Sequence, residues 1–125
     1  MTAVLDAGAL VGVDKRDRQV GALLRVFQRE GVQVLTSAGV VAQVWRDGRR
    51  QANLARVLAG TDVLQLDEAT ARKVGEVLKV NRSDDIVDAH IALMTGPKDV
   101  VLTSDDIGIK ALLRARRVRA TVVHV

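Results

Sequence analysis

The sequence has 125 residues, of which 48% are hydrophobic and 27% charged, and its formal net charge is +4. This apolar content is enough for the core of one domain, which we expect to span residues 1–125, and it excludes a disordered chain. The absence of cysteine excludes a disulfide framework, a thiolate zinc site and a cysteine nucleophile. Because residues 1–6 resemble no signal peptide and no stretch is apolar enough to span a membrane, we expect a cytoplasmic protein with no membrane partner.

Short β-branched runs alternate along the sequence with longer stretches of helical period. The runs predict strands at residues 3–5, 32–35, 63–66, 100–103 and 121–123. Small residues follow the first run, and the helical stretches predict helices at residues 17–30, 37–45, 50–58, 67–80, 84–94 and 107–115. Ser83 or Asp84 is the predicted cap of the fifth of these helices. Strands separated by helices predict an α/β fold with a mostly parallel central sheet flanked by helices.

Aspartates fall where several of these elements begin or end. Asp6 ends the first strand and Asp105 follows the buried run 100–103, while Asp85 and Asp88 lie three apart on one helix. Ligand sites of open α/β sheets form beyond the carboxyl ends of the strands, so we expect these carboxylates to converge. Each of these residues also has a purely structural interpretation. Asp6 and Asp105 can cap helices, and Asp84 and Asp85 are favourable at a helix N-terminus because of the helix dipole.

A cluster of carboxylates costs stability unless a cation neutralises it. Oxygen ligands with no cysteine and only two histidines favour Mg²⁺ or Mn²⁺ over zinc. Such an ion beside cationic side chains is a common means of cleaving phosphodiesters, since it activates water and neutralises developing charge. The pattern therefore predicts a metal-dependent hydrolase of phosphodiesters.

Three segments carry a resemblance to a known family. These are Val4-Leu-Asp-Ala-Gly-Ala-Leu10, Asp85-Ile-Val-Asp-Ala-His-Ile-Ala92 and Val101-Leu-Thr-Ser-Asp105. Together with residues 41–50 and the total length, they resemble the PIN-domain ribonucleases, and most of all the VapC toxins of bacterial toxin–antitoxin pairs. The similarity extends over essentially the whole sequence.

The resemblance implies a compact α/β/α domain and a toxin that cleaves RNA with Mg²⁺ or Mn²⁺. It also implies a cognate antitoxin as partner and a tendency to form homodimers. Position by position, it assigns Asp6, Asp88 and Asp105 to the metal and to catalysis. Thr103 and Ser104 match the hydroxyl-bearing residues that precede the last aspartate in the family. Together with Asp85, they are expected to orient the metal ligands without binding the ion themselves.

One position departs from the family. Where the family has a glutamate on the helix after the second strand, this sequence has Gln43. We place Gln43 in the catalytic site, but an amide lacks the charge and cannot act as a base, so metal binding should be weaker. Asp47, one turn further on, offers partial compensation. Two interpretations follow: an attenuated ribonuclease, or a PIN-like module that binds RNA or a partner without cleaving it.

Fourteen of the nineteen cationic residues are arginines, whose planar group suits phosphate. Arg46, Arg49 and Arg50 follow the helix that carries Gln43, and we expect them to contact the RNA substrate. The alternatives for this group are an acidic segment of the antitoxin or plain solvation. For His90 we expect a structural or partner role, because it points away from Asp88 on the same helix.

Overall fold

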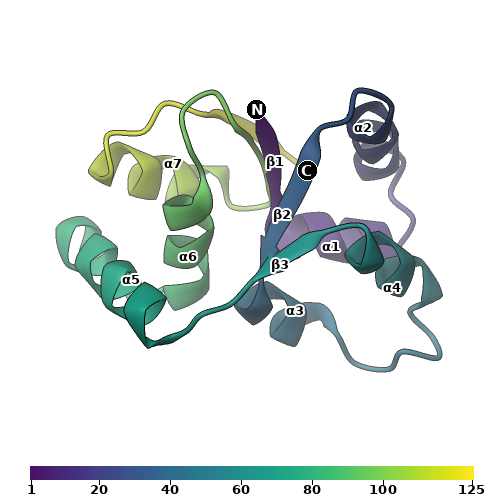
Figure 1. The fold of residues 1–125 in the computed structure, drawn as a ribbon, viewed down its shortest axis with the longest axis horizontal. Coiled ribbons are helices and arrows are strands. Elements are labelled where there is room, and N and C mark those ends of the chain that lie inside the picture. Colours follow the sequence, from purple (N-terminus) through teal and green to yellow (C-terminus); the bar gives the residue numbers. More distant parts are fainter.

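The structure, a computed structural model, describes residues 1–125 and contains one five-stranded sheet. Its strands are β1 (Thr2–Leu5), β2 (Gln33–Ser37), β3 (Asp62–Leu64), β4 (Val100–Thr103) and β5 (Thr121–His124). Their spatial order is β3-β2-β1-β4-β5, and every neighbouring pair is parallel (Figure 1). The predicted α/β class and mostly parallel sheet are therefore confirmed.

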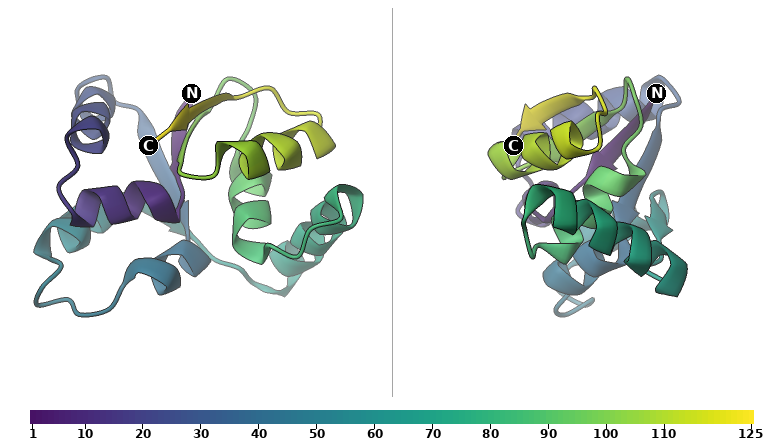
Figure 2. Two further views of the ribbon diagram at one scale, coloured as in Figure 1. Left: turned by 180° about the vertical axis from the view of Figure 1, so that it is seen from behind. Right: turned by 90° about the vertical axis from the view of Figure 1, so that its left-hand side faces the viewer.

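Helices cover both faces of this sheet. They are α1 (Ala7–Asp14), α2 (Arg18–Arg29), α3 (Ala38–Val44), α4 (Ala52–Ala59), α5 (Glu68–Asn81), α6 (Ile86–Met94) and α7 (Asp106–Ala115). In Figure 1, α1, α2 and α4 lie on one side of the strands and α5, α6 and α7 on the other, and Figure 2 shows the same two groups from behind. This division follows from the topology. The chain passes from β3 across β2 and β1 to β4, so strands are added in the opposite direction from there on, and right-handed connections then place the later helices on the other face.

The sequence did not predict α1. Residues 7–14 were noted only as small residues after the first strand, and their two glycines lower the helix propensity of this segment. Its tertiary contacts outweigh propensity: Ala9, Leu10 and Val13 are buried against the sheet and the neighbouring helices. Gly12 also lets Val20 of α2 approach closely, since a Cβ at residue 12 would lie 2.9 Å from its Cγ2.

The core is centred on the two middle strands. Residues 3–5 of β1 and residues 101–103 of β4 are all fully buried, as the unbroken apolar run at 100–102 predicted. Because both faces of these strands are covered, the polar groups at their carboxyl ends are held rigidly at one edge of the sheet. No helix is long and apolar enough to cross a membrane.

Candidate functional site

The N-termini of α1, α6 and α7 each carry a capping aspartate. Asp6 Oδ1 accepts from the Ala9 N–H of α1 at 3.1 Å, and Asp105 Oδ1 accepts from the Gly108 N–H of α7, also at 3.1 Å. Asp85 Oδ1 accepts from the Asp88 N–H of α6 at 2.9 Å. The cap of α6 is thus Asp85, and the prediction of Ser83 or Asp84 was wrong. Positive ends of helix dipoles meet at this edge of the sheet.

Asp6 is the most deeply placed of these carboxylates. Only 4% of its surface is exposed, and burial raises its pKa although Thr103 and backbone N–H groups bind the charged form. The Thr103 hydroxyl donates to Asp6 Oδ2 and accepts from the Asp105 N–H at 2.8 Å. Thr103 therefore links the aspartate after β1 to the aspartate after β4.

Asp88 lies in the first turn of α6 and is partly buried. Burial, the charge of Asp85 and the proximity of Asp105 and Asp6 together raise the pKa of its carboxyl from 3.8 to about 7. The charges of Asp85, Asp105 and Asp6 act on Asp88 in the same direction as its burial, so these carboxylates lie within electrostatic range of Asp88. The three aspartates at residues 6, 88 and 105 thus share one region at this edge of the sheet.

No cation balances this group. The ion pairs of the protein involve Asp47, Glu68 and Asp106, and none involves the four aspartates at residues 6, 85, 88 and 105. As the side chains stand, no three histidine or acidic residues are placed to hold one metal ion together. Asp6 and Asp105 each direct one carboxylate oxygen toward a helix N–H group.

Two glycines make room for the aspartate group. A Cβ at Gly8 would collide with the side chain of Ser104, and a Cβ at Gly108 would collide with the carboxylate of Asp105. Ser104 itself is exposed and packs against the start of α1. The sequence analysis did not single out either glycine, although Gly108 stands three residues after an aspartate, where a capping carboxylate needs space.

Gln43 lies on α3 with an exposed side chain that makes no hydrogen bond within the protein. Helix α3 approaches α6 through Gly39, where a Cβ would lie 3.2 Å from Cγ2 of Val87, the residue before Asp88. Gln43 is one turn further along α3 and therefore on nearly the same face as Gly39. Asp47 lies beyond the end of the helix, where its carboxylate oxygens are 3.9 Å from Arg49 and Arg50.

A buried hydrogen bond joins the start of α3 to α6, and the sequence analysis did not predict it. Ser37 Oγ and His90 Nδ1 lie 2.6 Å apart, and both residues are almost fully buried. Ser37 Oγ also accepts from the Gly39 N–H at 3.0 Å, so the same hydroxyl caps α3. Burial lowers the pKa of His90, which keeps the imidazole neutral and makes this contact structural.

The three predicted RNA-binding arginines lie in the segment between α3 and α4. Arg49 and Arg50 are exposed, each 3.9 Å from an oxygen of Asp47. Arg46 instead donates from NH1 to the carbonyl oxygens of Ala42 and Trp45, at 3.1 and 2.7 Å, and so caps the end of α3. The guanidinium groups of Arg49 and Arg50 are thus accessible to an external anion, whereas that of Arg46 also stabilises the end of α3.

Comparisons with known proteins bear on the fold. No protein-family model matches the sequence, and no curated protein matches it. The structure is similar to one chain of the crystal structure of VapBC2 from Rickettsia felis bound to a DNA fragment from their promoter, with a TM-score of 0.69 and 13% sequence identity. The match covers 100% of this chain and 99% of that chain. It confirms the PIN-like fold that the sequence motifs predicted.

Proposed function

We propose that the protein is a metal-dependent endoribonuclease that acts as the toxin of a type II toxin–antitoxin pair. The observation that carries the proposal is the group of aspartates at the carboxyl edge of the sheet with no cation among them, in which burial and the neighbouring carboxylates raise the pKa of Asp88 to about 7. Strongly perturbed carboxylates at such an edge are typical of functional sites. The structural similarity to a chain of a VapBC complex supports the same interpretation.

The donor chemistry of the site fits a divalent cation. Asp6, Asp88 and Asp105 offer only carboxylate oxygens, which Mg²⁺ and Mn²⁺ prefer, and their mutual repulsion is unrelieved by any Lys or Arg. These three residues would hold the ion once the side chains that cap α1 and α7 turn toward it. When bound, such an ion supplies a nucleophilic water and neutralises charge on the phosphate.

The surrounding residues prepare this arrangement. Thr103 holds the Asp6 carboxylate and the Asp105 backbone in a fixed relation. Asp85 binds the Asp88 N–H and raises the pKa of the Asp88 carboxyl, so Asp88 is partly protonated near neutral pH. Asp88 must give up this proton before it can act as a ligand, which makes metal binding dependent on pH.

We infer partners from the same similarity. The neighbour is described as VapBC2 bound to promoter DNA, so we propose that a cognate antitoxin binds this protein as well. RNA is the proposed substrate, and a homodimer in the cytoplasm the proposed state. Arg49 and Arg50 are exposed and paired only with Asp47, which leaves them able to contact RNA phosphates.

The test is incubation of the purified protein with a defined RNA in Mg²⁺, in Mn²⁺ and in chelator. We expect fragments with either metal and none in chelator, and Asp88→Asn should abolish them. Asp84→Asn is the matched control, because Asp84 is an exposed aspartate near the same helix whose side chain makes no hydrogen bond. Intact RNA under all conditions would contradict the proposal.

A second function is favoured by Gln43 and by the absence of three ready metal ligands. In that case the protein is a PIN-like module that binds RNA or a protein partner without cleaving it. The same incubation separates the two functions, since RNA that remains intact but comigrates with the protein would identify the binding module.

A further inference from the structure

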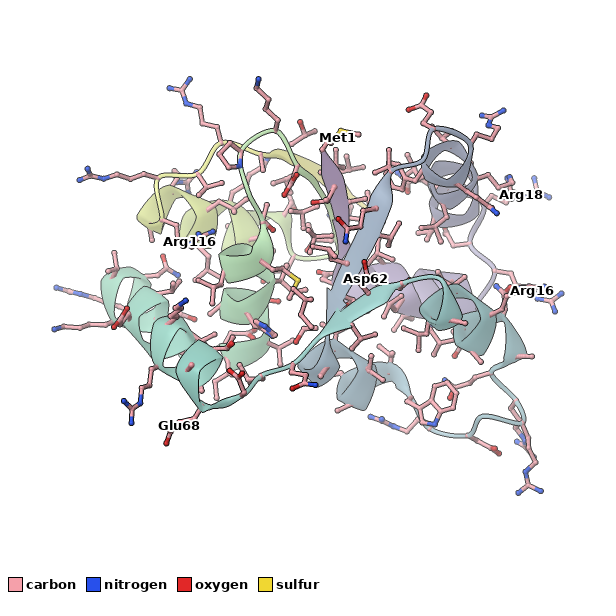
Figure 3. All side chains as sticks on the ribbon, viewed as in Figure 1. Met1, Arg16, Arg18, Asp62, Glu68 and Arg116 are labelled. Carbon is pink, nitrogen blue, oxygen red and sulfur yellow. The ribbon has the colours of Figure 1, made fainter.

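A cavity of about 350 Å³ lies between α2 and α4, beside the turn that joins α1 to α2. Three arginines line it: Arg16, Arg18 and Arg25. Their side chains are exposed, and none of them makes an ion pair or a side-chain hydrogen bond within the protein. Figure 3 shows Arg16 and Arg18 extending into solvent at the side of the molecule away from α5.

The other residues that line the cavity are apolar or neutral polar. Leu24 of α2 and Val57 of α4 supply apolar surface, together with Val13 at the end of α1. Asn53 is fixed there, since its amide donates to the Val13 carbonyl oxygen at 2.8 Å. Gln28 also lines the cavity, and its amide has no partner within the protein. The cavity thus combines three cations, an apolar surface and one amide without a partner.

The segment that carries Arg49 and Arg50 lies near the same end of α1 as the cavity. Gln51 binds the Arg46 N–H at 2.8 Å and donates to Asp14 Oδ2 at 3.1 Å, so this segment lies against the end of α1. Arg16 and Arg18 of the cavity come within four residues of the end of α1. Two groups of exposed cations therefore flank the same end of one helix.

Helix α1 also connects this basic region to the aspartate group. It begins directly after Asp6 and ends at Asp14. An eight-residue helix is about 12 Å long, so a single-stranded RNA lying along it would span a few nucleotides from the cavity to the aspartates.

We propose that this cavity is a nucleotide subsite that binds one unpaired nucleotide of the RNA at a distance from the cleaved bond. The proposal rests on the ribonuclease function proposed above. Arg16, Arg18 and Arg25 bind its phosphate and those on either side, while the base lies against Leu24 and Val57. Unstacked bases of single strands are read through such apolar contacts and side-chain hydrogen bonds, here from the Gln28 amide.

The size of the cavity is sufficient for a nucleotide. Its volume stands at the small end of the range for small-molecule sites, which run from about 300 to 1,000 Å³. A second cavity of about 570 Å³ shares Leu24, Gln28 and Val57 with it, so a single-stranded RNA can continue from one cavity into the other. Three arginines against the single carboxylate of Asp17 also suit a chain with one charge per nucleotide.

The first experiment measures binding in chelator, so that no RNA is cleaved. Fluorescence anisotropy with a short labelled single-stranded RNA should show at least tenfold weaker binding for the variant Arg16→Ala/Arg18→Ala/Arg25→Ala than for the unchanged protein. The slope of log affinity against log salt should fall by about 2, since each phosphate contact to a single strand contributes about 0.7. The matched control is Arg72→Ala/Lys73→Ala/Lys79→Ala, which removes as many charges from exposed positions on α5.

The second experiment tests the base. The unchanged protein should discriminate among the four homopolymeric RNAs, and Gln28→Ala should reduce that discrimination at least threefold while retaining the salt slope. Equal loss of affinity in the arginine variant and its α5 control would overturn the subsite, because it would reflect net charge alone. The subsite would also be overturned if the arginine variant bound RNA with unchanged affinity but no longer bound an acidic peptide. That result would identify a protein-docking site.

Cleavage is measured separately with metal. An RNA that is never cleaved but binds through the arginines would contradict the ribonuclease function and leave the subsite standing. Cleavage that depends on Asp88, without any effect of the three arginines on binding, would overturn the subsite alone.

Discussion

Asp85 binds the backbone of Asp88 and at the same time opposes the charge of its side chain. The Asp88 N–H donates to Asp85 Oδ1 at 2.9 Å, which begins α6, and the charge of Asp85 is one of the causes that raise the Asp88 pKa to about 7. Asp85, which caps α6, therefore also helps to bring the pKa of Asp88, the candidate metal ligand, close to neutral pH. This links the fold of α6 directly to the chemistry of the site.

The first prediction is a dependence of stability on pH in the absence of metal. The pKa of Asp88 rises on folding from 3.8 to about 7, so the folded protein binds a proton more tightly than the unfolded chain. Its contribution to stability is fully present below about pH 4 and is lost as pH rises to 7. Asp88→Asn should therefore stabilise the protein at pH 8 by about 2 kcal/mol, after allowance for solvent screening of a partly buried group.

The measurement is denaturant unfolding in chelator at several pH values between 4 and 8. The difference between Asp88→Asn and the unchanged protein isolates this residue from Asp6, whose pKa is also raised, and from Asp99, whose pKa is lowered. A difference that stays constant across this range would show that Asp88 does not titrate as described.

The second prediction concerns metal affinity. If Asp88 must be deprotonated to bind the ion, affinity for Mn²⁺ should fall about fivefold between pH 7 and pH 6 and change little above pH 8. The increase of Tm on adding metal follows the same dependence, because a ligand of the folded state stabilises it by mass action. Calorimetric titration measures both the affinity and the released proton. An equal increase of Tm in Asp88→Asn would remove Asp88 from the metal site.

The third prediction separates the arginines between α3 and α4. Arg49→Ala/Arg50→Ala should weaken RNA binding and reduce the salt slope by about 1.4, with stability unchanged within about 0.5 kcal/mol. Arg46→Ala should instead destabilise the protein by about 1 kcal/mol, because its bonds to Ala42 and Trp45 close α3. Binding and unfolding measurements on both variants check this. An unchanged salt slope in the double variant would assign Arg49 and Arg50 to solvation or to a protein partner.

The fourth prediction concerns the buried pair of Ser37 and His90. His90→Ala should destabilise the protein by about 2–3 kcal/mol, because it leaves a cavity and removes a partner of Ser37. Since burial lowers the pKa of His90, its contribution is present above about pH 6.5 and is lost as pH falls below that value. His124→Ala is the matched control, because His124 is exposed and its removal should cost far less. Equal effects of the two substitutions would contradict the structural role of His90.

The sequence predicted the sheet well because periodicity reports burial. The run at residues 100–102 has no polar alternation, and β4 is indeed covered on both faces. Helix α1 was not predicted because its glycines lower the local helix propensity. In the folded chain these glycines allow Ser104 and Val20 to approach the helix closely, which the sequence does not indicate. Local rules thus failed where tertiary packing decided the conformation.

The sequence predicts that the aspartates gather at one edge of the sheet, but it does not predict the contacts made by the residues around them. Asp6 and Asp105 stand at strand ends, so topology alone brings them to one edge. The link between Ser37 and His90 spans 53 residues and depends on how α6 packs on the sheet, which no spacing rule contains. The exposed arginines at residues 16, 18 and 25 gather around a cavity only once α2 and α4 lie side by side.

The last prediction concerns Gln43, on the face of α3 that approaches Val87 and hence Asp88. Gln43→Glu adds a negative charge toward the aspartates, which should tighten Mg²⁺ binding and raise the pKa of Asp88 above its present value of about 7. Cleavage should therefore increase more at low Mg²⁺ than at saturating Mg²⁺, while the metal-free protein becomes less stable through like-charge repulsion.

Gln43→Ala is the control, because it removes the amide without adding charge and should leave the Asp88 pKa unchanged. Cleavage rates across a Mg²⁺ series, with NMR titration of Asp88, measure these effects. An equal gain at all Mg²⁺ concentrations would indicate that the carboxylate positions or deprotonates water instead, and no effect of Gln43→Glu on affinity, pKa or rate would place residue 43 outside the site.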